Sequence, residues 1–142
     1  INTTINITEL GVRRIIFYFK LISDFRSLDH DLMVKLLKHN MMSLLQIHGV
    51  NSYNVKDNTF QQPDTDDTPF SANSLETVYG PEIYRLIMSI TINLHTYCQE
   101  DMTYIKILML IILFDPANEN LIESEKEIVK NLLNKYISLL YS

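Results

Sequence analysis

Cysteine is almost absent from this sequence of 142 residues, in which Cys98 is the only one. A single cysteine forms no internal disulfide and no cysteine-based zinc site, so we expect a reducing compartment. Glycine and proline are also scarce, with 3 and 4 residues, and there is no glycine-rich phosphate loop. Because hydrophobic residues make up 46% of the chain, this composition is typical of a folded, helix-rich domain.

Positive charge and long apolar runs are limited as well. The formal net charge is -5, and nonspecific nucleic-acid affinity comes from clustered Lys and Arg, so this segment is not expected to bind nucleic acid. The longest apolar run, Tyr104 to Phe114, is interrupted by Lys106 and is well short of the roughly 20 residues that span a bilayer. We therefore expect a buried helix there and no contact with a membrane.

Residues that bind metals or catalyse reactions are present, but their patterns do not favour such sites. His95 and Cys98 share a helix face, yet two ligands are too few for a structural site. Asp64, Asp66 and Asp67 lie among Thr, Gln and Pro residues, which indicates a solvated loop. We predict no metal, no cofactor and no catalytic residue. The alternative from another class is an enzyme that pairs a histidine with this acidic loop, which requires hydrogen-bonding reach between them.

Apolar residues recur at spacings of three and four, a pattern typical of amphipathic helices. The predicted helices are residues 4–22, 29–50, 81–99, 102–114 and 124–141. The buried stripe predicted for the third helix is Ile83, Leu86, Ile87, Ile90, Leu94 and Tyr97. Ser124 and Glu127 have the spacing of a capping box for the last helix. The predicted fold class is all-α, a layered antiparallel helical sandwich with a short irregular or β-hairpin segment near Tyr53 to Phe60.

Two groups of residues have a recognisable spacing. The first group consists of Tyr18-Phe19-Lys20, Phe25, Leu28 and Lys35-Leu36-Leu37-Lys38. It resembles the end of helix 3 and helix 4 in the ligand-binding domain of the nuclear-receptor family. The second group is similar to the end of helix 8 and to helix 9, and consists of Leu113-Phe114-Asp115-Pro116, Leu121, Val129, Leu132, Lys135-Tyr136 and Leu140. The two groups occur in the family's order, with room for helices 6 and 7 between them.

The resemblance implies that residues 1–142 are a partial ligand-binding domain, approximately from helix 3 to helix 9, without the first helices and without the C-terminal dimerisation and activation helices. Such a chain is either a fragment of a receptor or a shortened member of the family. It implies a ligand-regulated transcription factor in the nucleus that binds a small apolar ligand and a coregulator helix with a Leu-x-x-Leu-Leu motif. The full-length protein is then a possible receptor dimer. The alternative is a ligand-independent interaction module whose pocket is filled by side chains. A cavity of about 300 Å³ or more next to His48 would separate the two.

The same resemblance assigns residues to two sites. The coregulator site has Lys20 at a helix end, where its charge meets the unpaired carbonyls of a bound helix, together with a groove of Ile16, Met33, Val34, Leu37 and Lys38. The ligand cavity is lined by Thr8, Gly11, Val12, Met41, Met42, Leu45 and His48. His48 stands where many members have an arginine that holds a ligand carboxylate, so a carboxylate ligand is not expected. His48 either donates to a ketone or hydroxyl or is an ordinary core histidine.

Overall fold

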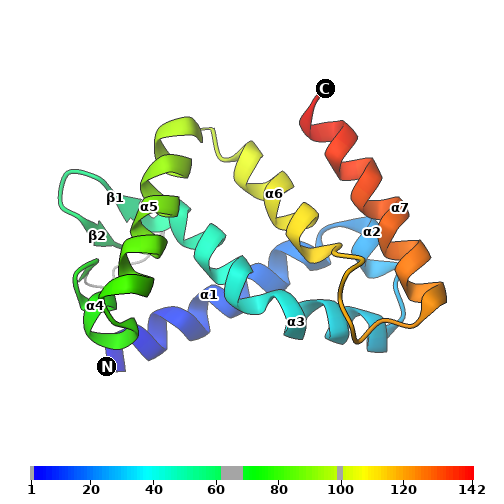
Figure 1. The fold of residues 1–142 in the computed structure, drawn as a ribbon, viewed down its shortest axis with the longest axis horizontal. Coiled ribbons are helices and arrows are strands. Elements are labelled where there is room, and N and C mark those ends of the chain that lie inside the picture. The colour runs from blue at the N-terminus through cyan, green and yellow to red at the C-terminus, as the bar shows by residue number, and fades with distance from the viewer. Residues whose placement is uncertain (1, 62–68, 99–100) are drawn as a thin grey trace.

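The computed structural model describes residues 2–61, 69–98 and 101–142 and is mainly helical (Figure 1). In chain order the helices are α1 (Asn2–Lys20), α2 (Ser23–Arg26), α3 (His30–Gly49), α4 (Ser74–Tyr79), α5 (Pro81–Cys98), α6 (Thr103–Leu113) and α7 (Glu123–Leu140), with a 3-10 turn, η1 (Val50–Ser52), after α3. The prediction of a mainly helical fold is confirmed. The predicted helix ends are correct to within two residues, except that residue 99 lies outside the described residues.

A small antiparallel sheet follows α3, with strands β1 (Tyr53–Asn54), β2 (Thr59–Phe60) and β3 (Phe70–Ser71) in the order β1-β2-β3. Tyr53 pairs with Phe60, and Phe60 pairs with Phe70. The ring centroids lie 5.1 Å apart in the first pair and 5.4 Å apart in the second. The hairpin of β1 and β2 is one of the two alternatives predicted for this segment, which were an irregular loop and a β-hairpin. The elements β3, α2 and α4 were not predicted, because elements of two to six residues are too short to show a periodicity.

Helix α3 runs through the middle of the molecule and packs against α1 and α6, and α6 packs in turn against α7 (Figure 1). Its buried face contains Leu32, Leu36, Asn40 and Leu44. The side-chain amide of Asn40 donates to the carbonyl oxygens of Leu36 at 2.8 Å and Leu113 at 3.2 Å. Leu113 is the last residue of α6, so its carbonyl has no partner within that helix. Asn40 on α3 therefore supplies the hydrogen bond that the last carbonyl group of α6 lacks within its own helix.

Helix α6 is buried over most of its length, as its sequence predicts. Between residues 104 and 114 only Tyr104 and Lys106 are exposed. The backbone carbonyl of Lys106 accepts a hydrogen bond of 2.9 Å from the Tyr18 hydroxyl on α1. Burial raises the pKa of Tyr18 to about 12, so this hydroxyl remains a donor at neutral pH.

Two local predictions were wrong. On α5, three of the residues assigned to the buried stripe are exposed, namely Ile83, Leu86 and Tyr97, whereas the buried ones are Met88, Thr91 and Cys98. Apolar residues occur on more than one side of this helix, and periodicity alone does not choose between sides. Helix α7 begins one residue before Ser124, and its first turn is capped by Glu125, whose carboxylate accepts from the Ile122 amide at 3.0 Å.

An ionic contact joins α2 to α7, which are far apart in the sequence. The Asp24 carboxylate accepts hydrogen bonds of 2.6 Å from the Lys135 ammonium and of 2.6 Å from the Tyr136 hydroxyl. These donors, Lys135 first and then Tyr136, hold the pKa of Asp24 below its usual value. The ring of Tyr136 is buried and stacks on Phe114, with 5.7 Å between centroids. Burial and the Asp24 charge raise the pKa of Tyr136, which keeps its hydroxyl protonated.

The Tyr136→Phe variant should lower the free energy of unfolding at pH 7 by about 1 kcal/mol, because a hydrogen bond to a carboxylate is lost while the ring packing remains. A carboxyl group with a lowered pKa contributes stability above its unfolded pKa, and this contribution is lost as the pH falls through the folded value. The difference between variant and parent should therefore shrink below about pH 4. Urea unfolding followed by circular dichroism at neutral and acid pH measures both effects.

Tyr141→Phe is the matched control, since the side chain of Tyr141 is 84% exposed and its hydroxyl is accessible to water. An equal loss of stability in this control would contradict the role given to the Tyr136 hydroxyl. A difference for Tyr136→Phe that is the same at neutral and acid pH would contradict the role given to the Asp24 charge.

Candidate functional site

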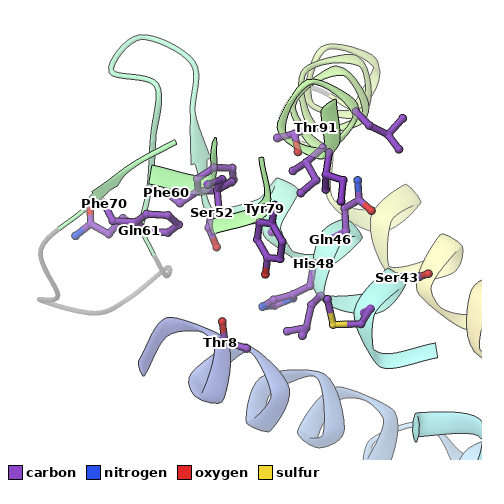
Figure 2. A pocket seen from close by; sticks show the side chains of 18 residues that line it. Thr8, Ser43, Gln46, His48, Ser52, Phe60, Gln61, Phe70, Tyr79 and Thr91 are labelled. Atoms are coloured by element: carbon purple, nitrogen blue, oxygen red, sulfur yellow. The ribbon is translucent and has the colours of Figure 1, made fainter. Parts of the chain in front are cut away.

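A cavity of about 410 Å³, partly open to solvent, lies between the first part of α1, the second half of α3, α4, α5 and the small sheet (Figure 2). Side chains of α3, α5 and the sheet supply most of its apolar wall, among them Leu45, Phe60, Phe70, Leu86 and Ile87. Hydrogen-bonding groups lie between them, from Thr8, Gln46, His48, Ser52, Gln61, Tyr79 and Thr91. A mainly apolar wall with a few polar groups is typical of sites for small molecules.

Of the seven residues that the sequence analysis assigned to a ligand cavity, five line this cavity, namely Thr8, Gly11, Met42, Leu45 and His48; their binding of a ligand stays a prediction. Val12 and Met41 are not among the lining residues. Met41 packs against the main core instead, because a one-residue step along a helix turns the side chain by about 100°. Met42 is 69% exposed, so it lies at the edge of the cavity rather than deep in it.

The sheet, α4 and α5 contribute lining residues that the sequence analysis did not find. Ile83, Leu86 and Ile87 were predicted as a core stripe, and they line the cavity instead. Ser52 and Phe60 were missed because their positions depend on η1 and on the register of β1 and β2. The backbone carbonyl of Ser52 accepts a hydrogen bond of 2.9 Å from the Gln61 amide, and no periodic pattern indicates such a contact.

Thr8, His48, Ser52 and Tyr79 reach the cavity from four different elements (Figure 2). Ser52 is only 6% exposed, and its hydroxyl oxygen has no hydrogen-bond partner in the part of the chain that the structure describes. The described lining residues include no Asp, Glu, Lys or Arg. Apart from His48, the described lining residues can therefore offer hydrogen bonds only from uncharged groups, and none of them is an Asp, Glu, Lys or Arg that would balance the charge of an ionised ligand.

The residues predicted for the coregulator site lie on α1 and on the first half of α3, away from the cavity (Figure 1). Lys20, the last residue of α1, and Lys38 are exposed, while the four apolar residues Ile16, Met33, Val34 and Leu37 are half-buried. The sequence analysis missed Phe17 and Leu21, which are 65% and 62% exposed on either side of Lys20. Both residues are apolar but do not share the helix face of the buried residues Ile15 and Phe19. This mismatch in the sequence could have indicated that they are exposed.

The groups considered for metal binding and catalysis do not gather into a site within the described residues. No group of three or more His, Cys, Asp or Glu side chains there could hold a metal ion. The Cys98 thiol is buried, and this burial raises its pKa. The acidic cluster of Asp64, Asp66 and Asp67 lies outside the described residues. A membrane-spanning helix, which needs both length and apolarity, is likewise not found among them.

Comparison with known proteins gives no match: no protein-family model fits the chain, and a search of curated proteins finds no relative. Function is therefore inferred from the residues themselves and from the geometry of the cavity.

If the cavity takes apolar molecules, enlarging a wall residue should exclude them. Ile87 is half-buried and lines the cavity, so Ile87→Trp should weaken the binding of the neutral dye Nile red by about tenfold or more, because the indole occupies the space that the dye needs. A fluorescence titration measures the affinity. Ile128→Trp on the exposed side of α7 is the control, since Ile128 is 45% exposed. Unchanged dye affinity in a folded Ile87→Trp protein would place the dye elsewhere.

Proposed function

We propose that the chain is part of a nuclear-receptor ligand-binding domain, in which a small apolar ligand regulates the binding of a coregulator helix. The observation that carries this proposal is the cavity of about 410 Å³ beside His48. Its volume lies within the range of about 300 to 1,000 Å³ that is usual for small-molecule sites. The ligand-independent alternative requires a pocket filled by side chains, and this volume favours ligand binding over it. In the proposed role the protein acts in the nucleus, and the full-length protein can dimerise.

The packing of the two groups of residues that resemble the family supports the proposal. Phe19, Phe25 and Leu36 from the first group share one core cluster with Leu113, Phe114 and Tyr136 from the second. The rings of Phe19 and Phe25 lie 5.6 Å apart between centroids. A shared family fold requires the matched residues to meet in the core, and these residues do. The order α1, α3, hairpin, α5, α6, α7 also agrees with helices 3 to 9 of the family.

The exposed end of α1 supports the second part of the proposal, the binding of a coregulator helix. Phe17 and Leu21 expose apolar surface next to Lys20, and Ile16 and Val34 are only half-buried. A Leu-x-x-Leu-Leu helix presents leucines on one side and unpaired carbonyl groups at its C-terminal end. The leucines would cover the apolar side chains, and the Lys20 ammonium would donate to those carbonyl groups, where the helix dipole is negative.

Lys20→Ala in the full-length protein should weaken the binding of a Leu-x-x-Leu-Leu peptide by about tenfold, the effect of losing a charge-assisted hydrogen bond. Fluorescence anisotropy with a labelled peptide measures this affinity. Lys56→Ala, in the exposed turn between β1 and β2, is the matched control and should bind as the parent does. Unchanged peptide affinity in a folded Lys20→Ala protein would remove the proposed contact, and a large loss of stability would show that Lys20 serves the core instead.

A further inference from the structure

We infer that the preferred ligand of the cavity is an uncharged, mostly apolar molecule with a hydroxyl or carbonyl group at the end that reaches Ser52. This inference rests on the proposed function, since it concerns the same cavity. It adds the chemical class of the ligand and names the residue that selects it.

The Ser52 hydroxyl is the strongest indication. Ser52 lines the cavity and is only 6% exposed. Its hydroxyl oxygen is buried and has no hydrogen-bond partner among the described residues. A buried polar group without a partner costs free energy, and a ligand atom that pairs with it recovers this cost. Figure 2 shows the Ser52 side chain on the cavity side of the sheet, across the open space from Thr8 and His48.

The position of Ser52 is fixed by the backbone around it. Its carbonyl oxygen accepts a hydrogen bond of 2.9 Å from the Gln61 amide. The next residue, Tyr53, is buried and pairs with Phe60 in the sheet. The hydroxyl can rotate about its own bonds, but the residue that bears it is held in place before a ligand arrives. A donor that is already positioned loses little entropy on binding.

The lining of the cavity determines the charge of the ligand. Apolar side chains such as Leu45, Phe60 and Ile87 form much of the wall, and the described lining residues include no Lys or Arg. A carboxylate or phosphate in this setting would lose part of its hydration and would find no Lys or Arg among the described lining residues, which leaves His48 as the one side chain there that can carry a positive charge. A neutral hydroxyl or carbonyl oxygen loses far less, and it can accept the Ser52 hydrogen. A ligand hydroxyl can also donate to the Ser52 oxygen, since a serine hydroxyl both donates and accepts.

Three probes of matched shape test the inference: para-phenylphenol, para-methylbiphenyl and the anion of para-phenylbenzoic acid. Each probe is titrated against the complex of Nile red with the parent protein, with Ser52→Ala and with Ser89→Ala, and displacement of the dye gives the affinity of the probe. Ser89 lies on α5, is exposed and is not a lining residue, so it is the matched control. The parent should prefer the phenol over the methyl compound by about five- to tenfold, as one buried hydrogen bond allows, and should bind the anion most weakly.

Ser52→Ala should reduce the preference for the phenol to less than about twofold, whereas Ser89→Ala should leave it unchanged. The melting temperature of Ser52→Ala should equal or exceed that of the parent, because the lost hydroxyl has no partner to lose. A preference for the phenol that survives in Ser52→Ala, a lower melting temperature, or tightest binding of the anion would each overturn the inference.

The Ile87→Trp variant shows whether a contradicting result concerns only the role of Ser52 or also the proposed ligand cavity. Because this variant is expected to lose the dye, its binding of the probes is measured directly by isothermal titration calorimetry. If it excludes all three probes while Ser52→Ala changes none of them, the cavity binds ligands and only the role of Ser52 is wrong. If no probe displaces the dye from the parent, or if Ile87→Trp still binds every probe, both the ligand cavity and the inference are wrong.

Discussion

The rest of the structure depends on the burial of one face of α3 along its whole length. Leu32, Leu36 and Leu44 are buried on this face, and α3 packs both against α1, which precedes it in the sequence, and against the distant helix α6. Asn40 interrupts the apolar face, and its amide donates to the last carbonyl of α6. Because an unpaired carbonyl at this depth would be costly, the contact fixes where α6 ends relative to α3. The position of α6 then fixes α7, which the contact of Lys135 with Asp24 joins to α2.

The two proposed sites share this central helix. The second half of α3 supplies Leu45 and His48 to the cavity, and its first half carries Val34, Leu37 and Lys38. Helix α1 has the same division, with Thr8 at the cavity and Lys20 at the other end. A ligand that displaced α1 relative to α3 would therefore change the geometry of both sites, because each helix contributes residues to both.

The sequence predicted the long helices well, because each keeps an apolar repeat for several turns. It did not predict the buried face of α5, where both Ile83 and Met88 are apolar but only Met88 is buried, because the packing decides which side of the helix faces the core. Asn40 could have been found, since it lies at the four-residue spacing of Leu36 and Leu44. Ser52 could not, because its place at the cavity depends on a backbone contact with Gln61. The part of the structure that the sequence does not predict is therefore the set of contacts made by segments without a periodic pattern, such as the one between Ser52 and Gln61.

The central claim is that the space between α3, α5 and the sheet is a ligand site. Hydrogen–deuterium exchange with and without saturating para-phenylphenol tests it directly, since ligand binding slows the local opening that exposes amides. The account predicts slower exchange in η1, β2 and the second half of α3, with no change in α7. Unchanged exchange in those three segments, or protection centred on α7, would contradict it.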